Sequence, residues 1–426
     1  MKKVGVAILG LGVVGGGTYK ILCDNKEYFK KMQKLDITVE NVLEKNVERA
    51  LSLGIDKSVI ATNIEEVVSN PNVDIVVEVI GGVEPAKTFL TKALKSGKTV
   101  VTSNKELFAK CWTELEQEAK ANNAGLFFEA TCVGGVPIIR ALQDSMQANK
   151  LLSLKGIING TTNYILTKMT YEGSSYEEAL KEAQKLGYAE FNPTADVEGF
   201  DATYKLSILS SLAFGTKITI DKIHREGITA VKKEDIAYGR ELGYTLKLLA
   251  IGKNTEHGIE ARVHPTFIKN DNPLAAVNDS FNAVHLLGDS VGEIMLYGRG
   301  AGALPTGSAI VSDIIFAAKH PDNYYAPFEN NEKGAAATKY VSDFSTQYYV
   351  RLTVNDTAGV LAKISAVFAK NDISVKEVSQ RSVENGFAQV ILVTHLSKES
   401  AMKKTLEKLG SLSEVKTIDA CIRIEE

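Results

Sequence analysis

The chain has 426 residues, of which 44% are hydrophobic and 24% charged, and its formal net charge is −3. This length allows two or three domains with separate cores, and the composition is that of a globular protein. A weakly negative chain offers no basic field to nucleic acid or to an anionic membrane surface, and no apolar run approaches the roughly 18 residues of a membrane span. The four cysteines are far apart and form no CxxC pair, which indicates reduced thiols in a cytoplasmic protein.

The first third of the chain alternates short apolar runs with longer helical patterns. Buried strands are predicted at residues 4–9, 37–43, 74–80, 98–102 and 125–129. Helices are predicted directly after the first strand and over residues 86–96 and 106–122. Because strands that are apolar throughout alternate with helices, the pattern indicates a parallel sheet covered on both faces. We predict an α/β fold whose first domain, residues 1–135, is a Rossmann-type doubly wound sheet that residues 300–320 complete.

The pattern changes after Pro137, where helices and strands become interleaved. Helices are predicted at residues 137–148, 161–171, 175–186 and 196–214. Strands are predicted at residues 245–251, 259–265, 282–287 and 292–297. We therefore expect a mixed α/β domain over residues 136–299. A glycine-rich loop at 298–307 then precedes a helix at 308–319, and residues 321–345, which lack periodicity, are predicted to be a connector.

Residues 346–426 have the pattern of an independent unit. Apolar residues alternate from Tyr348 to Val354, and the next apolar residues fall on one helical face. Strands predicted at 373–381 and 387–395 flank Asn385-Gly386, which is a hairpin signal. A second helix and a strand at 415–424 complete the order βαββαβ, which is ferredoxin-like.

A glycine motif, Gly10-Leu11-Gly12-Val13-Val14-Gly15, follows the first strand and opens the first helix. The three glycines allow a tight turn, a close approach of pyrophosphate and close packing of helix on strand. The start of the helix offers unpaired N–H groups to the phosphates. In this context the motif predicts a dinucleotide site.

The choice between NAD and NADP depends on charged residues near the end of the second strand. An acid about 20 residues beyond the glycines usually binds the ribose 2′-hydroxyl. Asp36 has that spacing but precedes the strand, whereas Glu44 and Lys45 directly follow it. Lys45 suits a 2′-phosphate and Glu44 repels one, so both cofactors remain candidates, with NADP favoured.

Two lysines and a group of acids are the candidate catalytic residues. Lys105 follows a predicted parallel strand, at the edge where open α/β sheets bind ligands. Asp201 and Lys205 are four residues apart on one predicted helix and share a face. Such a lysine is either a helix salt bridge, which the spacing alone favours, or a proton-transfer residue. The nearby acids Glu190 and Asp196 suit the amino group of an amino-acid substrate.

Seven motifs, in order, resemble the homoserine dehydrogenase family. They are GLGVVG (10–15), DIVVEVIGG (74–82), TSNKEL (102–107), FEATCVGGVPII (128–139), GIINGTTNYIL (156–166), GYAEFNPTADVEGFDATYKL (187–206) and GRGAGALPTGSA (298–309). The tail, with Asn355-Asp356-Thr357-Ala358-Gly359-Val360 between its first strand and first helix, resembles an ACT domain.

The resemblance implies NAD(P)-dependent interconversion of L-homoserine and L-aspartate 4-semialdehyde, in threonine and methionine biosynthesis. By position, Lys205 matches the proton donor or acceptor, and Lys105 a lysine near substrate and nicotinamide. Glu190 matches the carboxylate that binds the substrate amino group, with Asp196 and Asp201 nearby. The family's cofactor contact in the second glycine-rich loop matches Gly302, while Val13 replaces a common threonine. The family also carries a sodium ion, whose ligands match Glu129 and the backbone carbonyls of Cys132, Gly134 and Val136.

The family further implies a homodimer through the middle domain, or a homotetramer through the tails. The ACT-like tail is predicted either to bind an amino acid such as threonine near Asp356 and Gly359, or only to hold the oligomer together. Two rival functions are also considered. One is an aldehyde dehydrogenase with Cys132 as nucleophile, although no histidine lies near it in the sequence. The other is an inactive nucleotide-binding sensor that acts through its ACT domain.

Overall fold

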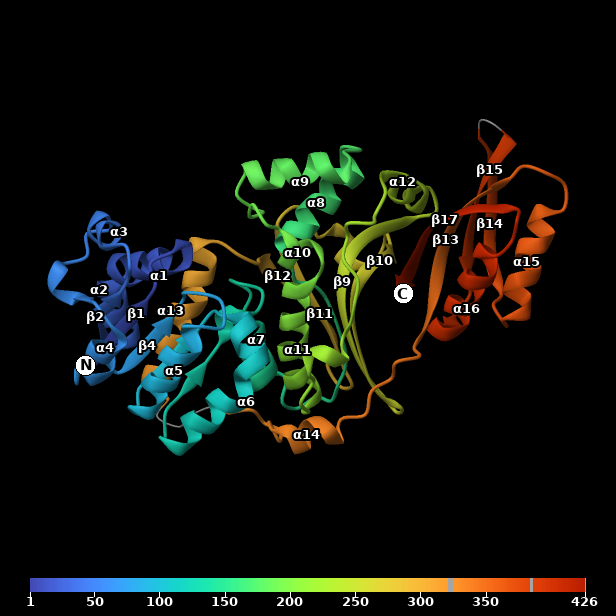
Figure 1. The fold of residues 1–426 in the computed structure, drawn as a ribbon. Coiled ribbons are helices and arrows are strands. Elements are labelled where there is room, and N and C mark those ends of the chain that lie inside the picture. Colours follow the sequence, from blue (N-terminus) through green and yellow to red (C-terminus); the bar gives the residue numbers. More distant parts are fainter. Residues whose placement is uncertain (321–324, 384–385, 426) are drawn as a thin grey trace.

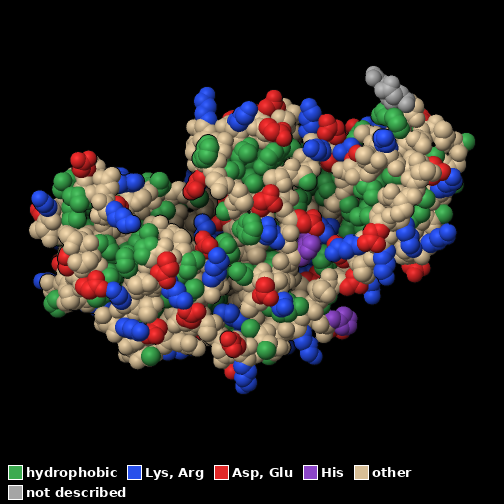
Figure 2. All heavy atoms as spheres, in the orientation of Figure 1, with side chains coloured by type: hydrophobic (Ala, Val, Ile, Leu, Met, Phe, Trp, Pro, Cys, Tyr) green, Lys and Arg blue, Asp and Glu red, His purple; other side chains and the backbone are tan. Residues whose placement is uncertain are grey.

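Three lobes follow one another along an elongated molecule, in the order of the sequence except for residues 303–319, which return to the first lobe (Figure 1). The computed structural model describes residues 1–320, 325–383 and 386–425. Lys and Arg side chains alternate with Asp and Glu over the visible surface of all three lobes (Figure 2). In the described part of the chain, no helix combines the length and the apolar character needed to cross a membrane.

The first lobe is built on a six-stranded parallel sheet in the order β3-β2-β1-β4-β5-β6. Its strands are β1 (Lys2–Leu9), β2 (Leu35–Leu43), β3 (Ile60–Ala61), β4 (Ile75–Glu78), β5 (Thr99–Thr102) and β6 (Leu126–Phe127). Its helices are α1 (Val13–Asp24), α2 (Lys26–Tyr28), α3 (Val47–Ser52), α4 (Ile64–Ser69), α5 (Ala86–Lys95) and α6 (Lys105–Ala121). All four residues of β4 are buried, as expected of a strand covered on both faces. The predicted Rossmann-type sheet is confirmed.

Two local features of this lobe position parts of the candidate active site. The side chain of Asn104 accepts a hydrogen bond from the N–H of Leu107 and so caps α6, which begins at Lys105. Helix α13 (Ala303–Lys319) returns from the middle lobe and packs beside α1 (Figure 1). A Cβ on Gly17 would lie 2.2 Å from the carbonyl oxygen of Ala303, so the two helices meet at a position where only glycine fits.

The middle lobe is a mostly antiparallel sheet covered by helices. Its strands are β7 (Leu151–Ile157), β8 (His224–Arg225), β9 (Tyr244–Thr255), β10 (Gly258–Lys269), β11 (Phe281–Gly288) and β12 (Gly292–Arg299), and the longer five follow the order β12-β11-β7-β9-β10. Its helices are α7 (Ile138–Arg140), α8 (Gly160–Tyr171), α9 (Tyr176–Lys185), α10 (Thr194–Val197), α11 (Phe200–Phe214) and α12 (Lys233–Glu241).

Two expectations for this lobe were wrong, and one strand was missed. The helix predicted at 196–214 is two helices, α10 and α11, because Gly199 adopts a left-handed φ of 79° between them. The helix predicted at 137–148 is only α7 followed by a π-helical turn over 141–145. Strand β7 was not predicted. Its run contains Lys155 and Gly156, and it forms a strand because β9 and β11 pair with it on both sides.

The third lobe has the predicted order βαββαβ, with its own hydrophobic core. Its elements are β13 (Ser345–Asn355), α15 (Val360–Lys370), β14 (Val375–Ser382), β15 (Phe387–Thr394), β16 (Ser397–Lys398), α16 (Glu399–Gly410) and β17 (Val415–Glu425). The hairpin signal Asn385-Gly386 falls partly outside the described residues, since Asn385 is not among them. The predicted ferredoxin-like unit is confirmed.

This lobe is nevertheless not independent of the rest. Strand β17 pairs in parallel with β10, with Thr266 opposite Arg423 and Ile268 opposite Glu425. The two sheets therefore form one sheet of eleven strands, with β12 at one end and β14 at the other. The connector, predicted without structure, contains the short helix α14 (Glu332–Ala337) and runs along the lower side of the middle lobe to the third (Figure 1).

Candidate active site

A cleft of about 520 Å³ lies between the first and middle lobes. The first lobe contributes the carboxyl end of β5 and the start of α1, and the middle lobe contributes α8, α11 and the loop before α13. Open α/β sheets bind ligands at this edge of the strands. The polar side chains of the lining are Ser103, Lys105, Thr131, Asn159, Thr161, Tyr188, Asp196, Asp201, Lys205, Ser280, Arg299 and Thr306.

One end of the cleft has the features of a phosphate site. Helix α1 begins after Gly12 and α13 after Gly302, and among the described residues no side chain caps either start. Their first N–H groups are therefore available to a negatively charged ligand. A Cβ on Gly15 would lie 2.1 Å from the carbonyl oxygen of Gly10, so this position requires glycine, as the motif predicts. Val14 and Gly302 line the cleft, and the arrangement fits a dinucleotide.

The charged residues near β2 differ in their positions relative to the glycine motif. Asp36 lies opposite Lys3 in the register of β2 with β1, at the opposite end of the sheet from the glycine motif. Its spacing from the glycines therefore does not place it at the dinucleotide site. Glu44 directly follows β2, and its carboxylate accepts hydrogen bonds from the N–H of Leu11 at 2.7 Å and of Asn46 at 2.9 Å. Lys45, the next residue, is exposed.

At the other end of the cleft, the Asp201 carboxylate binds both candidate lysines. Its Oδ2 lies 2.6 Å from Nζ of Lys205, and its Oδ1 lies 3.2 Å from Nζ of Lys105. Lys205 also donates to the carbonyl oxygen of Ile158 at 2.8 Å. Because an ammonium group has three N–H donors, this arrangement leaves one Lys205 N–H for a ligand in the cleft.

Local folding fixes this cluster. Gly199 ends α10 and allows α11 to start at Phe200, which puts Asp201 in the first turn and Lys205 one turn later. Asn159, which sequence reasoning missed, caps α8 through its Oδ1 and donates from Nδ2 to Asp196 at 2.7 Å and to Asp201 at 2.9 Å. An asparagine directly before Gly-Thr-Thr is a recognisable helix-capping signal, and it would have pointed to a fixed side chain here.

The cluster is electrostatically asymmetric. Burial raises the pKa of the Asp201 carboxyl, but the charges of Lys205 and Lys105 outweigh it and hold that pKa well below its usual range. The pKa of Lys105 is raised, chiefly by the charge of Asp201. In contrast, burial and then the neighbouring charge of Asp201 raise the pKa of Asp196. Asp201 is therefore the fixed anion of the site, whereas Asp196 gains from a cation placed beside it.

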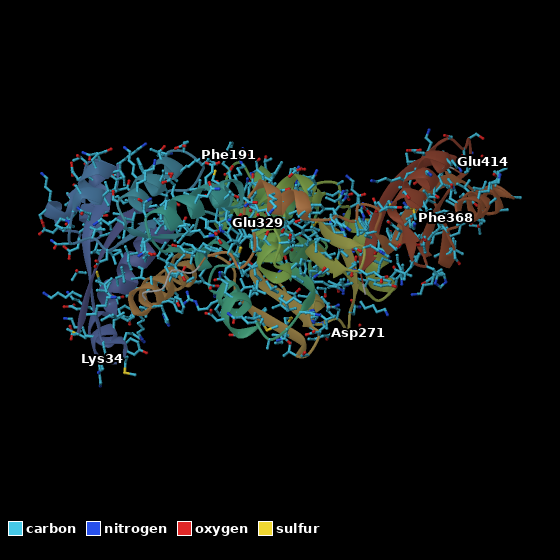
Figure 3. All side chains as sticks on the ribbon, turned by 90° about the horizontal axis from the view of Figure 1, so that it is seen from below. Lys34, Phe191, Asp271, Glu329, Phe368 and Glu414 are labelled. Atoms are coloured by element: carbon cyan, nitrogen blue, oxygen red, sulfur yellow. The ribbon has the colours of Figure 1, made fainter. Side chains whose placement is uncertain are left out.

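Glu190 lies at the rim, two residues beyond Tyr188, which lines the cleft. The Glu190 side chain is exposed, and its charge contributes to the raised pKa of Lys105. The next residue, Phe191, is 99% exposed and projects at the outer edge of the molecule (Figure 3). The structure thus brings Lys105, Asp196, Asp201 and Lys205 together and leaves Glu190 beside them.

The residues matched to a cation site lie on and behind the wall of the cleft, which Gly134 lines. The Glu129 carboxylate accepts hydrogen bonds from the N–H groups of Ile139 and Arg140, at 2.9 Å and 2.8 Å. In the described residues, no three His, Cys, Asp or Glu side chains gather as metal ligands, so an ion here would depend on backbone oxygens. The turn that carries Cys132, Gly134 and Val136 has left-handed backbone at Val133 and Gly134.

Cys132 is unsuited to be a nucleophile. Its side chain is completely buried, and its thiol lies 3.9 Å from the carbonyl oxygen of Lys205. Burial raises the pKa of the Cys132 thiol to about 12. Since the thiolate is the reactive form, this environment argues against an enzyme that acts through a covalent cysteine adduct.

The predicted effector residues lie in the third lobe, far along the chain from the cleft. Asp356 accepts hydrogen bonds from Oγ of Ser382 at 2.8 Å and from Nε2 of Gln380 at 3.3 Å, both on the edge strand β14. Gly359 precedes α15 with a left-handed φ of 89°. The loop is therefore held beside the free edge of the sheet.

A Rossmann-type sheet, a phosphate site at its glycine motif and a lysine–carboxylate cluster facing that site define an oxidoreductase that uses a nicotinamide dinucleotide. Family models agree in order along the chain: the homoserine dehydrogenase NAD-binding domain matches residues 10–129, homoserine dehydrogenase matches 137–315, and the ACT domain matches 348–414. The chain belongs to the homoserine dehydrogenase family.

Individual relatives support this assignment over the full length. The homoserine dehydrogenase of Bacillus subtilis is 39% identical over 434 residues, covering 100% of this chain and 99% of that protein. The crystal structure of a homoserine dehydrogenase from Thiobacillus denitrificans has a TM-score of 0.93 and 40% identity, with 100% and 99% coverage. A hyperthermophilic archaeal homoserine dehydrogenase in complex with NADPH has a TM-score of 0.65 and 30% identity, covering 76% of this chain and 100% of that one.

Proposed function

We propose that this chain interconverts L-homoserine and L-aspartate 4-semialdehyde, with Lys205 as the residue that moves the proton. When bound, the nicotinamide cofactor accepts or delivers the hydride at the carbon that carries the oxygen. Lys205 is the group suited to that oxygen, because two of its three N–H donors are engaged by Asp201 and Ile158 and the third faces the cleft. This single observation carries the proposal. Nothing in the cluster favours an inactive sensor, since two lysines and two acids, Lys105, Lys205, Asp196 and Asp201, line the same cleft.

In the direction of reduction, negative charge develops on the aldehyde oxygen. A Lys205 ammonium beside this oxygen stabilises the charge and then donates its proton, and in the reverse direction the amine takes the proton of the hydroxyl group. Asp201 fixes the position of the ammonium group. The carboxylates of the cleft suit the amino group of the substrate. We assign the binding of this group to Asp196 and, from the rim, to Glu190. Lys105 is assigned to the substrate carboxylate and the neighbouring cofactor ribose.

Replacing Lys205 with alanine is expected to lower kcat by at least about 100-fold, the low end for losing a general acid. The assay follows reduced cofactor by absorbance with L-homoserine at alkaline pH. Lys222→Ala, an exposed lysine of the same lobe, serves as the control and retains activity. A Lys205→Ala enzyme with a near-normal rate would remove this residue from the mechanism, and a wild-type protein that binds cofactor without turnover would favour the sensor.

We further propose that NADP is preferred to NAD, through Lys45. The Glu44 carboxylate is already engaged by the N–H groups of Leu11 and Asn46, so it is directed to the backbone of the glycine motif. Lys45 stands exposed at the end of β2, where a 2′-phosphate would lie. The archaeal relative's structure contains NADPH.

For Lys45→Ala we expect KM for NADP to rise about tenfold and KM for NAD to change by less than about twofold, since only NADP offers a phosphate to this charge. Steady-state kinetics with each cofactor measure the effect, and Lys31→Ala, an exposed lysine in the π-helical turn over 29–33 that precedes β2, is the matched control. An equal change for both cofactors would show that Lys45 does not select between them.

We also propose a structural sodium ion at Glu129 and the carbonyls of Cys132, Gly134 and Val136, because oxygen ligands suit a hard cation. For assembly, we propose a homodimer through the middle lobe, supported by the half-exposed Met295 and Tyr297 on the edge strand β12, and pairing of third lobes into a tetramer. The four cysteines are unpaired, which suits a cytoplasmic enzyme.

Finally, we propose that threonine binds at the third lobe, beside the loop that Asp356 ties to β14. Isothermal titration is expected to show heat with threonine but none with methionine or lysine, and Asp356→Ala is expected to abolish it because the loop loses its anchor. Asp372→Ala, in another loop of the same lobe, is the control. Titrations without heat for any of the three amino acids would assign the lobe a purely structural role.

A further inference from the structure

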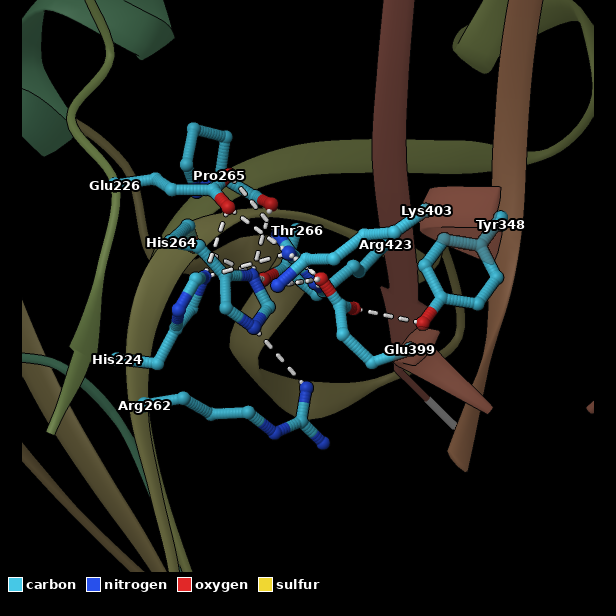
Figure 4. A network of polar contacts seen from close by, with 10 residues as sticks. All are labelled: His224, Glu226, Arg262, His264, Pro265, Thr266, Tyr348, Glu399, Lys403 and Arg423. Atoms are coloured by element: carbon cyan, nitrogen blue, oxygen red, sulfur yellow. Dashed lines mark hydrogen bonds and ion pairs between the residues drawn. The ribbon is translucent and has the colours of Figure 1, made fainter. Parts of the chain in front are cut away.

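A network of charged side chains joins the third lobe to the middle lobe (Figure 4). Arg423 of β17 donates to both oxygens of Glu226, at 2.9 Å and 2.8 Å. On its other side it donates twice to Glu399, at 2.9 Å and 2.6 Å, and Tyr348 also donates to Glu399. Only 7% of the Arg423 side chain is exposed. Paired bonds of this kind fix geometry as well as charge.

Glu226 belongs to a segment that shares an edge with β17. Strand β9 occupies one edge of β10 along its whole length. On the other edge, β8 pairs at Arg262 and Val263, and β17 pairs further on, from Thr266 to Ile268. Glu226 directly follows β8, and its N–H donates to the carbonyl oxygen of Val263 at 2.8 Å. The Arg423–Glu226 pair therefore links β17 to the residue after β8, at the point on β10 where one short strand pairing ends and the other begins.

The same segment holds the turn between α10 and α11. Arg225 donates to the carbonyl oxygen of Glu198, and its guanidinium stacks on the ring of Phe200 at 3.6 Å. The N–H of Ile228 donates to the carbonyl oxygen of Val197 at 2.8 Å. A Cβ on Gly227 would lie 2.4 Å from that same oxygen, so this close contact between the two backbones requires glycine.

This turn is the part of the chain that carries the acids of the cleft. Asp196 stands in α10 just before the turn, and Asp201 stands in the first turn of α11 just after it. We propose that Glu226, held by Arg423, is a positioning residue for the amino-acid substrate: through residues 225–228 it fixes the turn at the end of α10, which aims Asp196 into the cleft. The inference rests on the proposed function, in which Asp196 binds the substrate amino group.

The chain offers a matched control for this route. Asp235 of α12 accepts two hydrogen bonds from Arg351 of β13, at 2.6 Å and 3.1 Å, and a third from Tyr349. This pair crosses the same joint and is more deeply buried, because the Asp235 side chain is 1% exposed and that of Glu226 is 42% exposed. Among the described residues, none of the side-chain partners of Asp235 lies in the turn between α10 and α11. Loss of this pair is expected to weaken the contact between the middle and third lobes and to leave the acids of the cleft in position.

The experiment compares Glu226→Gln with Asp235→Asn in the full-length enzyme, by steady-state kinetics with homoserine and cofactor varied in turn. For Glu226→Gln we expect KM for homoserine to rise at least about fivefold, roughly the effect of one weakened hydrogen bond, with kcat and the cofactor KM changed by less than about twofold. For Asp235→Asn we expect all three values to stay near the wild type.

An unchanged homoserine KM in Glu226→Gln, or an equal rise in Asp235→Asn, would overturn the inference, since the second result would make it a general loosening of the joint. Arg225→Met tests the same route inside the middle lobe, because it removes the bond to Glu198 and leaves Arg423 and Glu226 intact. It should reproduce the selective rise in KM, and an unchanged KM would also overturn the inference. An inactive wild-type enzyme would instead contradict the proposed function.

Discussion

The Asp201 carboxylate is the interaction on which the cleft depends. It is buried, and its two oxygens bind Lys205 and Lys105 separately, so two ammonium groups of like charge are held in one small volume and still separated. Without this anion the lysines would repel each other and lose their common direction. Asn159 links the same carboxylate to Asp196, which places the acidic and basic parts of the site in one hydrogen-bonded unit.

The turn between α10 and α11, next to Asp196, depends in turn on contacts that reach across the molecule. Gly199 starts α11, the segment 225–228 bonds to the turn before it at Val197 and Glu198, and β10 pairs with both this segment and the last strand of the chain. The third lobe therefore contributes to the sheet on which the middle lobe is built. A domain that merely hung from a linker would have no such connection. The joint gives the ACT domain a physical route to the substrate side of the cleft.

Much of this was predictable, and the failures have physical causes. The apolar strands of the first lobe and the alternation of the third carry their own periodic signals, so both folds were predicted correctly. Strand β7 carries no such signal, because its conformation comes from pairing with β9 and β11, and the β10–β17 pairing joins residues more than 150 positions apart. For the site, the resemblance of the motifs to the family pointed to Lys105, Asp201 and Lys205. Spacing alone favoured a plain salt bridge between Asp201 and Lys205. The burial of Asp201 and its second lysine are visible only in three dimensions.

The most direct test of the account is the kinetics of Asp201→Asn, which keeps the size of the side chain and removes its charge. We predict that kcat for homoserine falls at least about 100-fold, comparable to losing a general acid, because Lys205 is no longer held at the reacting oxygen. Cofactor binding, followed by fluorescence, should weaken only slightly, since the glycine motif is untouched and only the contact of Lys105 with the ribose is disturbed. A kcat within about threefold of the wild type, well inside the effect expected of a catalytic group, would contradict the central role of this carboxylate.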